Sequence, residues 1–174
     1  MIEKYPNKAP IAHNNRGTYY RSNKKYDAAL ADFNKAISLK SDYHLAYNNR
    51  GNVYFNQRKF EQAAADYTKV LEIKPDNEKA YGNRGGVYIE QKKYDLAEKD
   101  LTKAIEIDPF YLDAYMNRGV LYSMTNRFDL AKKDYDSYIK YRNNNAMIYH
   151  WRGIAQQQTG QHQAATQDLS LIHI

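Results

Sequence analysis

The sequence contains no cysteine and only four prolines in 174 residues. Without cysteine the chain has no disulfide, no thiol nucleophile and no cysteine-bound metal. No apolar run approaches the roughly 20 residues that a membrane-spanning helix requires. The first nine residues are polar and lack the apolar core of a signal peptide. A cytoplasmic location without a membrane partner is the default expectation, although a processed secreted fragment would have the same composition.

Residue patterns that support catalysis or cofactor binding are also missing. The five histidines do not share a helix face at metal-ligand spacing, and no Ser-His-Asp order or carboxylate pair stands out. The glycine-rich stretch 82–86 is superficially similar to a phosphate-binding loop, but it follows no predicted strand, which that motif requires. We therefore predict no catalytic residue, no metal and no cofactor, and do not expect an enzyme.

The charge of the chain is only weakly one-sided. The net charge is +6, and basic and acidic side chains are mixed without a block of either sign. This pattern is typical of a solvated surface. The eighteen tyrosines suggest base stacking, but most of them recur at positions that we expect to be buried. Nucleic-acid binding is therefore only a minor alternative.

The dominant feature of the sequence is a repeat of 34 residues. An Arg-Gly pair recurs at this interval: Arg16-Gly17, Arg50-Gly51, Arg84-Gly85, Arg118-Gly119 and Arg152-Gly153. An alanine follows each pair at a constant distance: Ala29, Ala63, Ala97, Ala131 and Ala165. A fixed period of this length indicates a stacked array of one supersecondary unit. We number the positions of each unit 1 to 34. The expected units are 10–43, 44–77, 78–111, 112–145 and 146–174, the last incomplete, after a lead-in of residues 1–9.

Each unit contains two apolar stripes at helical spacing. In the second unit, Tyr47 and Tyr54 belong to the first stripe, and Ala63, Tyr67 and Val70 belong to the second. The small residues at positions 8 and 20, glycine and alanine, would let the two helices approach closely. A single helix pair cannot bury its apolar face alone, so we expect neighbouring pairs to stack into a solenoid.

The order of these residues resembles the tetratricopeptide repeat family, whose unit has an aromatic residue, Leu-Gly, Tyr, Ala, an aromatic residue and Pro at this spacing. The resemblance extends from Pro10 to about Leu169. It implies an all-α fold, a right-handed superhelical solenoid of antiparallel helix pairs. The chain departs from the family at position 7, where Arg replaces the usual Leu. It therefore resembles a variant of the family with Asn-Arg-Gly in the first helix.

The recurring arginine has a recurring acidic partner. Position 23 is aspartate in every unit: Asp32, Asp66, Asp100, Asp134 and Asp168. A half-buried guanidinium is unfavourable without a charged partner, and an aspartate can supply a bidentate one. We predict five internal ion pairs, with Arg50 bonded to Asp66 or to the equivalent aspartate of an adjacent unit. A ladder of arginines that binds phosphate is the alternative.

The resemblance also implies that the first helices line a concave face that binds extended peptides. Position 6 of this face is Asn in four units, and an amide can both donate to and accept from a peptide backbone. This is similar to the asparagine ladder of the nucleocytoplasmic N-acetylglucosamine transferase. Alternatively, these side chains bind the backbone of the next unit. The predicted groove residues are Asn15, Asn49, Asn83, Asn117, Asn48, Asn52, Asn56, Lys79, Met116, Val120 and Met124.

Three further expectations concern particular positions. Gly82 and Gly86 should hollow the middle of the groove and leave room for a bulky ligand side chain. Only Asn49 and Lys79 match the clamp with which the family holds chaperone C-terminal carboxylates, so that ligand is not expected. Tyr138 is larger than its counterparts in the first three units, which predicts looser stacking of the last two.

The sequence therefore favours a non-catalytic protein–protein interaction scaffold that binds an extended peptide segment of a partner protein in its concave groove. A substrate-recruiting accessory domain of a larger enzyme is the main alternative. We expect a monomer, unless the C-terminal end, which lacks a polar capping helix, self-associates.

Overall fold

The computed structural model describes residues 8–170, which form ten α-helices. They are α1 (Ala9–Ser22), α2 (Tyr26–Leu39), α3 (His44–Asn56), α4 (Phe60–Ile73), α5 (Glu78–Glu90), α6 (Tyr94–Ile107), α7 (Leu112–Met124), α8 (Phe128–Tyr141), α9 (Ala146–Gln158) and α10 (His162–Ser170). Most of the predicted lead-in and the last four residues, where the chain end without a capping helix was expected, lie outside the described residues.

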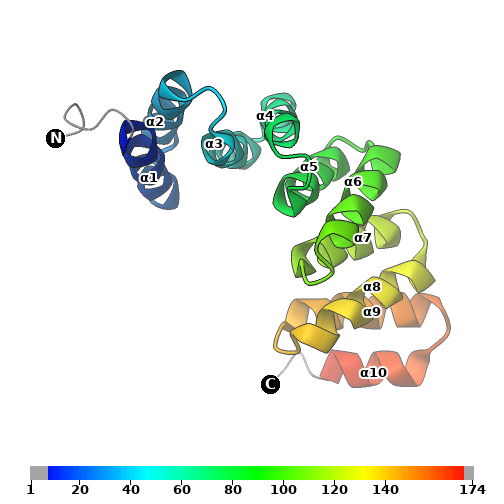
Figure 1. Cartoon of the computed structure of the whole chain (residues 1–174). Helices are drawn as coiled ribbons and strands as arrows, with labels where there is room; N and C mark the ends of the chain where they lie inside the picture. Colours follow the sequence, from blue (N-terminus) through cyan, green and yellow to red (C-terminus); the bar gives the residue numbers. More distant parts are fainter. Residues whose placement is uncertain (1–7, 171–174) are drawn as a thin grey trace.

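The helices form antiparallel pairs, α1 with α2 through α9 with α10, and each pair stacks on the next. Figure 1 shows the pairs following one another along a curve, with α1, α3, α5 and α7 toward its inner side. The predicted all-α, right-handed solenoid is confirmed. Among residues 8–170, no helix combines the length and apolar character needed to cross a bilayer.

The turn within each helix pair contains a residue in the left-handed conformation at position 15. Its φ is positive in every unit: Lys24 (57°), Arg58 (58°), Lys92 (58°), Asn126 (59°) and Gly160 (77°). In the third unit, the N–H of Lys93 donates to the carbonyl of Tyr88, and that of Lys92 donates to Ile89, which closes the end of α5. Lysine and arginine adopt this conformation at a cost of about 1–2 kcal/mol, so helix packing must hold these turns.

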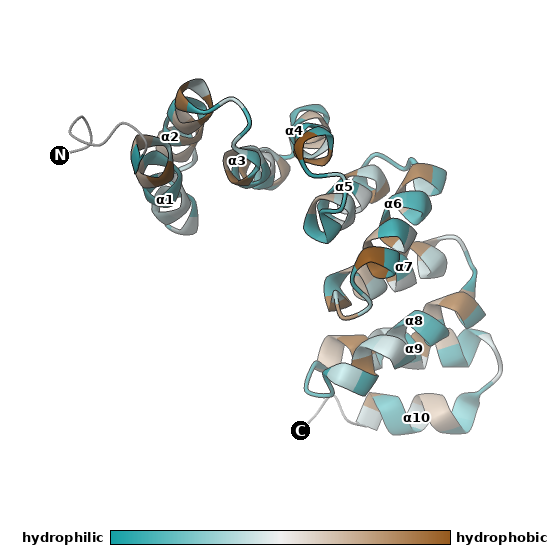
Figure 2. Ribbon diagram, in the orientation of Figure 1, coloured by the Kyte–Doolittle hydropathy of each residue, from teal (hydrophilic) through white to brown (hydrophobic). Residues whose placement is uncertain are grey.

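The glycine at position 8 makes room for the large residue at position 24. A Cβ atom on Gly51 would lie 2.8 Å from the Tyr67 ring, so only glycine permits this approach. The alanine at position 20 is buried beside it, as Ala63 is. The same close approach joins Gly17 to Phe33, Gly85 to Leu101 and Gly119 to Tyr135, and a slightly looser one joins Gly153 to Leu169, where the distance is 3.2 Å. Figure 2 accordingly shows hydrophobic residues as patches on the helices rather than all around them.

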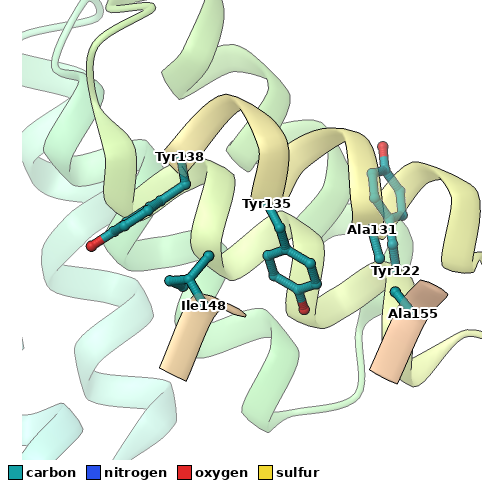
Figure 3. Close-up of a cluster of buried hydrophobic side chains, with 6 residues drawn as sticks. All are labelled: Tyr122, Ala131, Tyr135, Tyr138, Ile148 and Ala155. Atoms are coloured by element: carbon teal, nitrogen blue, oxygen red, sulfur yellow. The ribbon is translucent and has the colours of Figure 1, made fainter. Parts of the chain in front are cut away.

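The looser stacking predicted around Tyr138 is wrong. Its side chain is only 2% exposed and packs in one cluster with Tyr135 and Ile148 (Figure 3). The reason is that positions 27 and 34 share one space: where one position has a large side chain, the other has a small one. In unit three, position 34 is Tyr111, which packs beside an alanine at position 27. In unit four, position 34 is Asn145, whose Nδ2 donates to the Tyr138 hydroxyl at 3.1 Å.

Candidate functional site

In each of the five units, one arginine–aspartate pair joins the two helices. Nε of Arg84 donates to Oδ2 of Asp100 at 2.7 Å, and Nη2 donates to Oδ1 at 2.9 Å. The same two bonds join Arg16 to Asp32, Arg50 to Asp66, Arg118 to Asp134 and Arg152 to Asp168. The predicted internal ion pairs are confirmed, and the guanidinium groups are engaged with carboxylates rather than free to bind phosphate.

From the second unit onward, each arginine also binds the preceding unit. Nη1 of Arg84 donates to Oγ1 of Thr68 at 3.0 Å. Equivalent bonds run from Arg50 to Asn34, from Arg118 to Thr102 and from Arg152 to Asp136. All four acceptors occupy position 25, a connection that sequence reasoning missed. The signal was available, because a short polar residue recurs there at the repeat interval.

Aromatic rings complete the surroundings of these arginines. The guanidinium carbon of Arg84 lies 5.7 Å from the ring centre of Tyr81 and 5.8 Å from that of Tyr88. Rings in this range attract a cation. The tyrosines at positions 4 and 11 therefore belong to the stacking frame, the set of side chains at positions 4, 7, 11, 23 and 25 that joins the helices and the units.

The arginine of the first pair is more exposed than the arginines of the internal pairs, although its partner Asp32 is as buried as Asp100. The Arg16 side chain is 50% exposed, whereas that of Arg84 is 17% exposed. Hydrogen bonding from Arg16, assisted by His13, lowers the pKa of Asp32. At Asp66, burial outweighs the hydrogen bond from the arginine and raises the pKa of the carboxyl group. The Asp66 carboxylate thus depends more strongly on its arginine to stay charged than Asp32 does.

On the groove face, two of the position-6 asparagines are bonded to the preceding unit. Nδ2 of Asn49 donates to Oδ1 of Asn14 at 2.9 Å, and Nδ2 of Asn83 donates to Oδ1 of Asn48 at 3.2 Å. Longer bonds reach position 9, at Thr18 and Asn52. These asparagines therefore do contact a neighbouring unit, as the alternative expected, but they bind side chains of the preceding unit and not the backbone of the next one. Among the described residues, nothing donates to Oδ1 of Asn49 or Asn83, so both oxygens remain acceptors.

Asn117 differs from these two asparagines. Positions 5 and 9 of the preceding unit are Gly82 and Gly86, which have no side chain to accept its amide hydrogens. Within residues 8–170, the Asn117 side chain makes no hydrogen bond, and only its Nδ2, at 3.8 Å, would lie near a Cβ atom on Gly86. The whole Asn117 amide is therefore free.

A pocket of about 280 Å³ opens beside Asn117, between α3, α5 and α7. Its apolar lining comes from Phe55, Ile89 and Val120. Both Gly82 and Gly86 line this pocket. The two glycines differ in their surroundings, because the Tyr111 ring packs directly against Gly82, whereas the space beside Gly86 holds no side chain closer than Asn117.

The other predicted groove residues lie on the same helices in different surroundings. Met116 packs against the cluster around Tyr135, so it belongs partly to the core. Met124 is 51% exposed. Asn15, Asn56 and Lys79 are exposed. Among residues 8–170, no three His, Asp or Glu side chains gather as a metal site.

Comparison with protein-family models identifies the repeat. Models of the tetratricopeptide repeat match residues 44–77 and 78–111, and two further models of the same repeat match residues 17–58 and 101–133. Together they cover residues 17–133, more than half of the chain. The chain belongs to the tetratricopeptide repeat family. A search of the curated proteins finds no match.

Several solved protein structures share the fold. Pseudomonas aeruginosa pilF has a TM-score of 0.89 at 20% identity, covering 97% of this chain and 77% of that one. A MamA protein has a TM-score of 0.81 at 19% identity, over 94% and 90%. YrrB, described as a TPR protein with an unusual peptide-binding site, has a TM-score of 0.74 at 22% identity, over 97% and 87%. At these identities the likeness concerns the fold alone.

Proposed function

We propose that this chain is a non-catalytic scaffold that binds an extended peptide segment of a partner protein in the groove lined by α1, α3, α5 and α7. Members of the tetratricopeptide repeat family generally bind protein partners and are generally not enzymes, which supports a scaffold. The five expected units would act as one domain, in a variant whose first-helix Asn-Arg-Gly places asparagine in the groove and arginine in the frame.

The observation that carries the proposal is the line of amides at position 6. Asn49 and Asn83 have their nitrogens bonded to the preceding unit and their carbonyl oxygens unused. Held side chains lose little conformational freedom when a ligand binds. Their oxygens suit the N–H groups of a peptide backbone. The remaining predicted groove residues would contact side chains of the peptide, with Lys79 supplying a positive charge at the groove edge and Met124 an adaptable apolar surface.

The test is selection from a library of random linear peptides displayed on phage, using the whole chain as bait. The triple variant Asn49→Ala, Asn83→Ala and Asn117→Ala should lose the selected peptides and keep its helical circular dichroism, because alanine is the better helix former. A matched control changes three exposed residues of even-numbered helices, Ser38→Ala, Gln62→Ala and Lys133→Ala, and should bind as the parent does. Unchanged binding by the triple asparagine variant would contradict the proposal.

A further inference from the structure

We infer that the pocket between α3, α5 and α7 is an anchor site for one uncharged, apolar side chain of the bound peptide, with the Asn117 amide holding the backbone of that same residue. The inference rests on the proposed peptide-binding function and specifies what the groove recognises. It concerns the one step of the asparagine series at which the described structure departs from its own pattern.

The first support is the state of the Asn117 amide. At the two preceding steps, the position-6 nitrogen is occupied by acceptors of the previous unit, such as Asn48 for Asn83. At the step from α5 to α7, Gly82 and Gly86 remove both acceptors. A free carboxamide offers a donor and an acceptor side by side, which matches the C=O and N–H of one residue in an extended chain.

The second support is that packing explains Gly82 but does not explain Gly86. Glycine weakens the interior of a helix, so its presence needs a reason. At Gly82 the reason is the Tyr111 ring, which a Cβ atom would strike. At Gly86 a Cβ atom would meet only Nδ2 of Asn117, at an ordinary contact distance of 3.8 Å. A side chain at position 86 would therefore fit the fold, and its absence keeps the pocket open.

The third support is the chemistry of the pocket. Phe55, Ile89 and Val120 supply its apolar walls, and its volume of about 280 Å³ lies near the small end of ligand sites, which suits one side chain rather than a folded element. The Tyr67 hydroxyl at its base already donates to Oδ1 of Asn52 at 2.7 Å.

The charges at the pocket rim explain why an apolar occupant is favoured. Glu90 is the charged residue of the lining, and its carboxylate is paired with Arg58 at 3.5 Å. A cationic side chain in the pocket would have to compete with Arg58, and an anionic one would be repelled by Glu90. Leucine, methionine or phenylalanine would meet the walls without burying an unpaired charge.

The test variant is Gly86→Asn. It places an amide at position 9, as Asn52 does one unit earlier, and so gives Asn117 an acceptor while filling the pocket. Asparagine is a better helix former than glycine, so the fold should be kept. The matched control is Gly160→Asn, at a turn position with a φ of 77° and no atom within 4 Å of a built Cβ.

Peptides are selected from the random linear library with the parent chain, and their affinities are measured by fluorescence anisotropy. We expect one position of the selected peptides to be enriched in Leu, Met or Phe. Gly86→Asn should weaken binding at least about tenfold, and Gly160→Asn should not. Replacing the enriched residue by Ala should weaken binding to the parent chain by a similar factor, with no further loss in Gly86→Asn, as a double-mutant cycle requires for direct contact.

Four results would overturn the anchor site. Equal affinity of the parent and Gly86→Asn would reject the anchor site and leave groove binding intact, as would enrichment of a charged residue at the fixed position. Selection of no peptide by the parent chain would reject the proposed function and the anchor site together. If a thermal melt shows Gly86→Asn to be unfolded, Asn117→Ala takes its place in the same cycle, and additive losses would reject the contact.

Discussion

The stacking frame and the groove are built from neighbouring residues of the same helices, yet they follow opposite rules. At position 7, Arg84 and its four counterparts make the same bidentate bond to position 23 in every unit. One residue earlier, at position 6, the side chain is tied to the preceding unit at Asn83 and free at Asn117. The positions that repeat hold the units together, and the positions that break the repeat leave groups available to a partner.

The physical reason lies in the architecture of a solenoid. Each unit contacts only its neighbours, so every internal interface poses the same packing problem and accepts the same solution. A groove that recognises one peptide sequence needs unlike surroundings along its length. The contrast between frame and groove can therefore be tested by asking which variants lower stability and which lower binding.

The largest effect should come from breaking the internal frame. Arg84→Ala leaves the Asp100 carboxylate, which is 6% exposed, without its partner. Removing one member of a buried pair is typically destabilising by about 3–5 kcal/mol. The measurement is urea unfolding followed by circular dichroism. The matched control Arg16→Ala removes a half-exposed guanidinium and leaves Asp32 with His13 as a partner at 2.9 Å, so it should lower the free energy of unfolding by about 1 kcal/mol or less. Equal losses would show that the frame does not depend on burial.

The next effect tests whether positions 27 and 34 share one space at Tyr138. Tyr138→Ala should lower the free energy of unfolding by about 3 kcal/mol, because it leaves a cavity in a packed cluster. Adding Asn145→Tyr to that variant recreates the Ala–Tyr combination of units one and three. We expect part of the stability to return in the same urea titration. If the second change lowers stability further, the two positions do not share one space.

A smaller effect separates the last unit from the middle of the solenoid. Gln156 occupies the position where four units have tyrosine, and its buried Oε1 has no hydrogen-bond partner among residues 8–170. An unsatisfied buried group weakens the structure by about 1–3 kcal/mol. Amides from Ala146 onward should therefore exchange with deuterium first, and Gln156→Tyr should slow them. Uniform protection of all units in the parent chain would count against this expectation.

The smallest effect concerns the strained turns. Lys92 has a φ of 58°, a conformation that glycine adopts more easily. Lys92→Gly should raise the free energy of unfolding by about 1 kcal/mol or less. The reverse change, Gly160→Lys, should lower it by a similar amount. A loss on Lys92→Gly would mean that the lysine side chain itself stabilises the turn.

Sequence periodicity predicted the features that recur in every unit. Helix pairs and the partnership of Arg50 with Asp66 follow from residues that return at one interval, because repeated residues occupy equivalent environments. The contact between the arginine and position 25 also recurs, but the residue at position 25 varies among Asn, Thr and Asp. The sequence therefore signals this contact only through a polar residue that returns at the repeat interval.

Features that differ between units were harder to predict. The packing of Tyr111 on Gly82 and the burial of Tyr138 depend on how volumes add up across an interface. The repeat interval of 34 residues does not reveal how the side-chain volumes of two units combine at their interface. The Asn117 amide likewise lacks partners because Gly82 and Gly86 have no side chains. Seeing this requires knowing that positions 5 and 9 of one unit face position 6 of the next. That the groove binds a peptide at these residues remains a prediction.

The most direct test measures stability and peptide affinity together for Arg84→Ala and Asn117→Ala, using a peptide selected by the parent chain. Arg84→Ala should lose about 3–5 kcal/mol of stability and, at a temperature where it is folded, bind within about twofold of the parent. Asn117→Ala should keep its stability and bind about tenfold more weakly. A large loss of stability in Asn117→Ala with unchanged affinity would contradict the separation of frame and groove.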